Sequence, residues 1–382
     1  MTLFFLFFAC TLAEKPTDNP PQESDESSTV DDSEPSDSDS ASEPTDTSEA
    51  IEPHSLYFPP LDSEEWESLE PEIAFPNWDS ELLPPLREYL QERNTKSFLI
   101  LVDGKIVLEE YYDGHGVDKF WYWASAGKTL TTAVVGIAAQ EGDLMLDASV
   151  SDYLGAGWTS ATPDKEAQIT SHHLLTMTSG LNDSLGDNVE PANLQYVADA
   201  GTRWAYHNVY VKLQDVVSAA TGQSWEVYFR EKLRDRIGMS GGWFEIGDGL
   251  HVYGSNTRSM ARFGLLALAQ GQWGGEMIVD ETFFSNATQP SQDINHSYGY
   301  LWWINGQDSY RLPQVQLEFP GSLIPNGPSD MVMALGKNDQ KIYVVPSRKM
   351  VIVRMGNLAY DSSLALSNFD NELWEKLNQF LD

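Results

Sequence analysis

Two groups of β-type runs, one near each end of the folded part, most constrain the fold that this sequence can adopt. Residues 98–102 and 106–112 are rich in β-branched, aromatic and other apolar side chains, and the Asp103-Gly104 pair between them is typical of a hairpin turn. Three further β-type runs, MVMALG, KIYVVPS and KMVIVRMG, lie near the other end. Between the groups, apolar periodicity predicts helices. We therefore expect an α+β fold, with an antiparallel sheet of five or more strands flanked by helices and a mainly helical region. The active site is expected where the two regions meet.

Residues 121–142 contain the pair of side chains that points most directly to chemistry. Ser125 and Lys128 are three positions apart, so a helix places them on the same face. Residues 130–140 are nearly all apolar or small, which predicts a buried helix rather than an amphipathic one. A neutral amine one turn from a hydroxyl can activate that hydroxyl as a nucleophile. The alternative interpretation is a helix cap and a surface lysine.

The chain opens with an apolar run over residues 3–9, followed by its single cysteine, Cys10. The run is much shorter than the roughly 20 residues needed to span a bilayer, and it is typical of a secretory signal. A small residue followed by cysteine resembles the lipobox of bacterial lipoproteins. We therefore predict a signal or lipoprotein-like segment over residues 1–13, with Cys10 as a candidate lipidation site that would tether the protein to a membrane. A plain signal peptide with an incidental cysteine is the alternative. Both predict export across the bacterial inner membrane, and the first predicts a periplasmic or outer-membrane lipoprotein.

Residues 14–56 are predicted to be a disordered acidic linker that precedes one domain over residues 57–382. Residues 17–53 are rich in Ser, Asp, Glu, Thr and Pro, include 13 acids, and contain too few apolar side chains to offset the entropy of ordering. The formal net charge of −35 leaves about −22 on the rest of the chain. Such a surface argues against nucleic acid as a partner, because phosphates require a basic footprint.

The sequence offers no pattern for a metal site or a bound cofactor. His172 and His173 are adjacent and would point apart on a helix, and the H-E-x-x-H pattern does not occur. We expect neither a metal nor a cofactor.

Three short motifs in order give the chain a resemblance to a known family. Ser-Ala-Gly-Lys at 125–128 has the S-x-x-K pattern, Tyr-His-Asn follows at 206–208, and Ala-Leu-Gly lies on a late strand at 334–336. Together they resemble the serine β-lactamase and DD-peptidase superfamily. Within it the chain is most similar to the class C β-lactamase-like serine hydrolases, the branch of esterases and 6-aminohexanoate-dimer hydrolases. The resemblance implies the β-lactamase/transpeptidase-like fold.

The resemblance also implies catalytic roles. Ser125 would attack a carbonyl carbon to form an acyl-enzyme, and Lys128 would accept its proton. Tyr206 would act as a second general base and relay the proton to the leaving group. Asn208 would hold Lys128 or a substrate carbonyl by hydrogen bonds.

An oxyanion hole is implied at the late strand. Its two donors would be the backbone N–H groups of Ser125 and Lys337. Gly336 would leave room for the substrate to approach. The third motif departs from the family, because Ala334 stands where a Lys or His helps to bind the substrate carboxylate. This departure disfavours a β-lactam or D-alanyl peptide.

The sequence therefore predicts a serine hydrolase acting on a small ester, amide or peptide-like substrate. One alternative is a penicillin-binding DD-peptidase or β-lactamase. Another is a catalytically silent member of the family that only binds its ligand. The sequence does not indicate the oligomeric state.

Overall fold

The computed structural model describes residues 56–62, 65–246, 250–361 and 367–381, all within one compact unit. The predicted signal segment 1–13, Cys10 and the linker up to residue 55 lie outside the described residues, so they stay predictions. Among the helices that are described, none is both long and apolar enough to cross a membrane.

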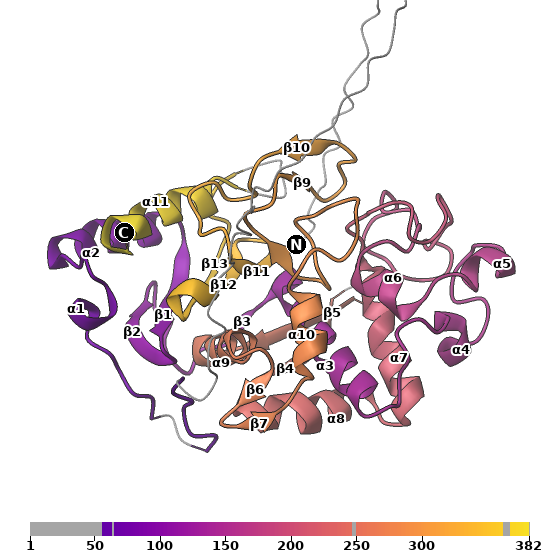
Figure 1. Ribbon diagram of the computed structural model, residues 1–382, viewed down its shortest axis with the longest axis horizontal. Helices are drawn as coiled ribbons and strands as arrows, with labels where there is room; N and C mark the ends of the chain where they lie inside the picture. Colours follow the sequence, from indigo (N-terminus) through magenta and orange to yellow (C-terminus); the bar gives the residue numbers. More distant parts are fainter. Residues whose placement is uncertain (1–55, 63–64, 247–249, 362–366, 382) are drawn as a thin grey trace, which may run out of the picture. The chain divides into compact units, whose positions relative to one another are not determined.

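The expected antiparallel sheet is present and contains six strands in the order β2-β1-β13-β12-β11-β8 (Figure 1). Its strands are β1 (Thr95–Val102), β2 (Lys105–Tyr111), β8 (Trp303–Ile304), β11 (Val332–Gly336), β12 (Gln340–Val345) and β13 (Met350–Gly356). The pairing of β1 with β13 joins the early hairpin to the late strands. The predicted fold class is therefore confirmed.

The turn between β1 and β2 shows why its sequence predicted a hairpin. Asp103 and Gly104 both have positive φ, 51° and 81°, as a two-residue hairpin turn of the favoured type requires. Gly104 has a second constraint, because a Cβ there would lie 1.9 Å from the carbonyl oxygen of Tyr57.

Helices flank the sheet and make up the region between the two groups of strands. Those that flank the sheet are α2 (Leu83–Glu92), α9 (Thr257–Leu268) and α11 (Phe369–Leu381), with the short α1 (Pro71–Ala74) before them. Those of the helical region are α3 (Lys128–Gln140), α4 (Val150–Leu154), α5 (Pro163–Glu166), α6 (Ser171–Leu175), α7 (Lys212–Thr221), α8 (Trp225–Phe229) and α10 (Glu281–Ala287). Two 3₁₀ turns, η3 (Ala124–Gly127) and η4 (Asn208–Val211), lead into α3 and α7.

The large sheet is covered on both faces. On β12, Tyr343 packs edge-on against Trp374 of α11, with ring centroids 5.7 Å apart. The adjacent Ile342 points to the opposite face, as alternation along a strand requires. There α9 approaches so closely that a Cβ on Gly264 would lie 3.1 Å from an Ile342 methyl group. Burial on both faces explains why the late strands are almost continuously apolar.

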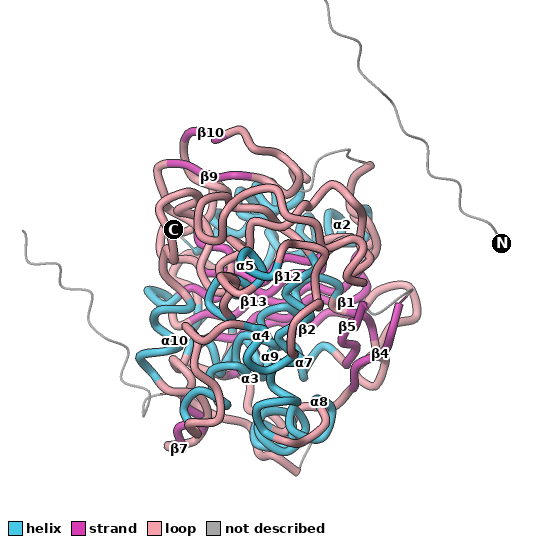
Figure 2. Tube along the Cα trace, turned by 90° about the vertical axis from the view of Figure 1, so that its right-hand side faces the viewer, coloured by secondary structure: helices cyan, strands magenta, loops and turns pink. Residues whose placement is uncertain are grey.

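Smaller strand pairs, which the sequence did not predict, complete the unit. They are β3 (Trp121–Tyr122), β5 (Leu250–Ser255) and β4 (Gly242–Ile246) in one sheet, β6 (Gln272–Trp273) with β7 (Glu276–Met277), and β9 (Ser309–Arg311) with β10 (Glu318–Pro320). Figures 1 and 2 both place the β9–β10 hairpin at the opposite end of the unit from α8.

A buried ion pair fixes α11 to the sheet. Lys341 of β12 donates to Asp370 of α11 at 2.8 Å, and each side chain is 3% exposed. The Tyr343 hydroxyl donates to the other oxygen of the same carboxylate at 2.6 Å. Both oxygens of Asp370 are thus used, which is the condition under which a buried charge is tolerated.

We expect Asp370→Ala to lower the free energy of unfolding by about 2 kcal/mol. It leaves the buried Tyr343 hydroxyl without this acceptor, while the Lys341 ammonium keeps its ion pair with Asp339 at 3.3 Å. Urea denaturation measures the change. Glu375→Ala removes an exposed carboxylate from the same helix and should change the free energy by less than about 0.5 kcal/mol. Equal effects of the two substitutions would contradict a structural role for the buried pair.

Candidate active site

Ser125 lies in the η3 turn, which runs directly into α3. The preceding residue, Ala124, has a φ of 48°, a left-handed conformation that is costly for a side chain with a Cβ. Such a conformation persists where the surroundings fix it. Here the neighbouring Trp123 is fixed twice, through its backbone N–H to the Tyr253 carbonyl and its indole N–H to the Ser255 hydroxyl, both at 2.8 Å.

Lys128, the first residue of α3, is 2% exposed and lies against the serine. Its Nζ is 2.8 Å from Ser125 Oγ and 3.4 Å from Asn208 Oδ1. Burial lowers the pKa of Lys128 from 10.5 to about 7, while the negative charge of Asp187 acts in the opposite direction. A large fraction of this amine is therefore neutral at neutral pH and able to accept a proton.

Two aromatic rings complete the surroundings of the amine. The Lys128 Nζ lies 4.7 Å from the ring centroid of Tyr206 and 4.5 Å from that of Tyr210. Ring faces attract an ammonium group, so they favour the protonated form and offset part of the cost of burial.

Tyr206 is positioned by aromatic packing. Its ring stacks on Trp303 of β8 at 5.8 Å and meets Tyr298 edge-on at 6.1 Å. Burial raises the pKa of Tyr206 to about 12, with its hydrogen bond to Ser125 acting in the opposite direction. The hydroxyl is therefore protonated at neutral pH, which suits a residue that relays a proton better than one that starts as a phenolate.

Asn208 begins η4 and bridges two groups. Its Oδ1 accepts from Lys128, and its Nδ2 donates to Asp187 Oδ1 at 2.8 Å. His207, between Tyr206 and Asn208, is buried, and burial lowers its pKa to about 4. It is therefore neutral and adds no positive charge beside Lys128.

Gly336 brings the end of β11 against the serine-bearing turn. A Cβ at this position would lie 2.4 Å from the Trp123 carbonyl oxygen and 3.0 Å from the Ala126 backbone nitrogen. The structure thus gives glycine a different reason from the room for substrate that the sequence suggested: the strand and η3 touch. Lys337 follows in an exposed turn. Its part in an oxyanion hole stays a prediction.

The structure shows the surroundings of Ala334, where the resemblance described above implies a Lys or His. Ala334 is 1% exposed and pairs with Ile342 inside the large sheet. The exposed Lys337 lies beyond the end of the strand rather than at this position. Neither residue places a cation where Ala334 stands.

The structure brings together four of the side chains that the sequence singled out: Ser125, Lys128, Tyr206 and Asn208. They lie where the η3 turn meets both β11 and α3, which agrees with a site at the junction of the sheet and the helical region. Sequence reasoning missed two contributors. Tyr210 lies in η4, four residues after Tyr206, and Asp187 comes from a loop without a recognisable pattern.

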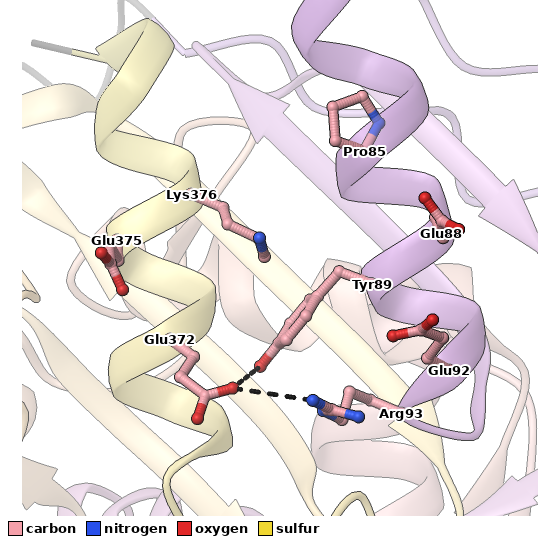
Figure 3. A pocket seen from close by; sticks show the side chains of 8 residues that line it. All are labelled: Pro85, Glu88, Tyr89, Glu92, Arg93, Glu372, Glu375 and Lys376. Atoms are coloured by element: carbon pink, nitrogen blue, oxygen red, sulfur yellow. Dashed lines mark hydrogen bonds and ion pairs between the residues drawn. The ribbon is translucent and has the colours of Figure 1, made fainter.

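A separate surface hollow of about 480 Å³ lies between α2 and α11, away from these residues. Figure 3 shows Tyr89 of α2 and Arg93, the residue after this helix, both reaching Glu372 of α11 across it. It contains none of the predicted catalytic side chains. Within the described part of the chain, no cluster of three or more His, Cys, Asp or Glu side chains is placed to hold a metal ion.

A comparison with models of known protein families shows to which family this chain belongs. A model of the Beta-lactamase family matches residues 86–373, more than half of the chain. The chain belongs to the Beta-lactamase family. This span includes every residue of the site described above, and it confirms the resemblance drawn from the three motifs. A search of curated proteins found no match.

Solved structures of Beta-lactamase-like proteins share the fold. A protein of Bacillus anthracis that is assigned by name to the 6-aminohexanoate-dimer hydrolases is 20% identical, with a TM-score of 0.61 over 86% of this chain and 90% of its own. A penicillin-binding protein from Bacillus halodurans is 18% identical, with a TM-score of 0.56 over 72% of this chain and 97% of its own. At these identities the likeness concerns the fold alone.

We expect Gly336→Ala to destabilise the protein by about 1–3 kcal/mol, because the new methyl group would overlap the backbone of η3. It should also slow acylation of Ser125, because the turn must move to make room. Urea denaturation and labelling by an acylating probe measure the two effects. Gly116→Ala is the control, since a Cβ there has no neighbour within 4 Å. If both substitutions behaved alike, the contact between β11 and η3 would not constrain the site.

Proposed function

We propose that this member of the Beta-lactamase family is a serine hydrolase that cleaves an ester or amide through an acyl-enzyme on Ser125. The observation that carries the proposal is the buried Lys128 amine 2.8 Å from the Ser125 hydroxyl. A neutral amine at that distance can take the hydroxyl proton as Oγ attacks a carbonyl carbon.

The remaining steps use the same residues. The C–Oγ bond forms and the carbonyl becomes a tetrahedral oxyanion, for which the backbone N–H groups of Ser125 and Lys337 are the proposed donors. Collapse of this intermediate breaks the bond to the leaving group. The leaving atom takes the Tyr206 hydroxyl proton, and Tyr206 regains a proton from the Lys128 ammonium. Water then attacks the acyl carbon of the ester, and its proton passes to the same bases. The acyl–Oγ bond breaks, Oγ takes that proton to restore the Ser125 hydroxyl, and the carboxylic acid product leaves.

The proposed substrate lacks the carboxylate that anchors penicillins and D-alanyl peptides. The support is the position of Ala334, which has no cationic side chain, together with the exposed carboxylate of Asp187 near the amine. A negative charge on the substrate would meet no cation at Ala334. Small neutral esters and amides therefore fit the site better, in line with the esterase members of the branch that the sequence resembles.

A fluorophosphonate probe tests the proposal. We expect wild-type protein to gain one covalent adduct, located on Ser125 by peptide mass spectrometry, and Ser125→Ala to gain none. Turnover of p-nitrophenyl esters should follow the same pattern. An adduct that survives Ser125→Ala would contradict the proposed nucleophile. An absence of labelling with every acylating probe would favour a binding protein without catalysis.

The pH dependence of labelling tests the role of Lys128. Because only the neutral amine accepts the proton, the rate should rise about tenfold per pH unit below 7 and level off above it, with a midpoint near the lowered pKa of about 7. Lys128→Ala should reduce the limiting rate by about 10²–10⁴-fold and remove this midpoint. A midpoint near 10 would show that the amine keeps its ordinary pKa.

The rival function is a penicillin-binding peptidase or β-lactamase. The penicillin-binding protein among the similar structures supports it only at the level of the fold. Covalent capture of penicillin on Ser125, at rates comparable to those of the esters, would favour this rival.

A further inference from the structure

Lys128 can act as a base only if the lone pair of its amine points toward Ser125. A neutral lysine amine has two N–H bonds and one lone pair, and catalysis needs that lone pair to face the Ser125 hydroxyl. Its hydrogens must then be directed to other acceptors. Asn208 Oδ1, at 3.4 Å, is such an acceptor. The orientation of the Asn208 amide therefore decides whether the Lys128 lone pair is available to the serine.

The amide of Asn208 could in principle face Lys128 with either end. With Oδ1 toward the amine it accepts a hydrogen and leaves the lone pair to Ser125. Turned over, its NH₂ group would donate to that lone pair and compete with the serine hydroxyl. An amide's two ends have nearly the same shape, so the hydrogen-bond partner on its far side must select between them.

That partner is Asp187. Its Oδ1 lies 2.8 Å from Asn208 Nδ2. An ionised carboxylate can only accept hydrogen bonds, so the amide must present its NH₂ group to Asp187 and its oxygen to Lys128. The bond to a charged acceptor is also stronger than one between neutral groups.

We propose that Asp187 is a positioning residue, which fixes the Asn208 amide so that the Lys128 lone pair is kept for Ser125. The inference rests on the proposed function, because it concerns the acylation step. It assigns a positioning role to the loop around residue 187, which is linked to the nucleophile by hydrogen bonds through Asn208 and Lys128.

The loop that carries Asp187 is fixed at its base. Arg203 binds Asp183 at 2.6 Å, and the Asp183 side chain is only 6% exposed. The Asn182 backbone N–H donates to the Gln195 carbonyl at 2.8 Å, which closes the other side. Asp187 itself is exposed, so it can be changed without disturbing the core.

The charges around Lys128 allow this role to be separated from a purely electrostatic one. Asp187 raises the pKa of Lys128, whereas Tyr206 and Tyr210 remain uncharged because burial raises their pKa values. His207 is neutral, since burial lowers its pKa to about 4.

Two further charges, Asp183 and Arg203, act on His207 in opposite directions and form an ion pair with each other. Because Asp187 raises the pKa of Lys128, its removal should shift the pH midpoint of acylation downward. By charge alone this would leave more of the amine neutral and make labelling at pH 6 faster. This effect of charge does not lower the limiting rate at high pH, whereas loss of positioning does.

The experiment measures the rate of fluorophosphonate labelling against pH in full-length protein. We expect Asp187→Ala to lower the limiting rate at high pH by about tenfold, the order expected for a misoriented catalytic group, and to lower the midpoint. Glu190→Ala, which removes another exposed carboxylate from the same loop, should change neither. An unchanged or higher limiting rate in Asp187→Ala would overturn the proposal.

A double substitution tests whether the effect passes through Asn208. In an Asn208→Ala background the added Asp187→Ala change should leave the limiting rate within about twofold, because the amide to be oriented is gone. If each substitution instead lowered the limiting rate by its own factor and the two factors multiplied in the double variant, the proposal would be overturned. Labelling of Ser125 in the wild-type protein is the separate check on the proposed function, so the two ideas can fail independently.

Discussion

The site depends on the burial of a lysine without a directly bound counter-charge. Lys128 is 2% exposed, and among the described residues no carboxylate forms an ion pair with it. Its polar contacts are the hydroxyl of Ser125 and the amide oxygen of Asn208. A buried ammonium in these surroundings is destabilised relative to the amine, and the pKa falls to about 7. The same side chain on a solvated helix would stay protonated and could not act as a base.

The rest of the architecture holds this arrangement in place. The η3 turn keeps Ala124 in a left-handed conformation because Trp123 is bound on both its backbone and its indole. β11 supports the turn from the other side, and only glycine at position 336 allows the two backbones to come that close. The strand is in turn anchored through β12, whose Lys341 pairs with Asp370 in the closing helix. The stability of the sheet and the geometry of the site are therefore linked.

The features that could be predicted from the sequence are those determined by residues close together in the chain. Asp103-Gly104 predicted the first hairpin because both positions need positive φ, and the β-type composition of the late runs predicted that they join it in one antiparallel sheet. Ser125 and Lys128 could be paired because helical spacing fixes their relation.

Other features depended on contacts between distant segments. Asp187 could not be identified because its role depends on where a loop meets Asn208. The reason for Gly336 was also hidden, since it depends on contact with a turn that lies far away in the sequence. In the small β3-β5-β4 sheet beside Trp123, β3 has only two residues and its partner β5 lies far away in the sequence, so this pairing leaves no local signal.

The pKa of the Lys128 amine in the free enzyme is the most direct test of this account. Protein labelled with ¹³C at the lysine ε-carbon, with the Lys128 resonance assigned by its loss in Lys128→Arg, can be titrated by NMR. The account predicts a titration near pH 7, against the ordinary value of 10.5. A Lys128 signal that titrates above about pH 10, as an unperturbed lysine does, would contradict the claim that burial makes this amine the base.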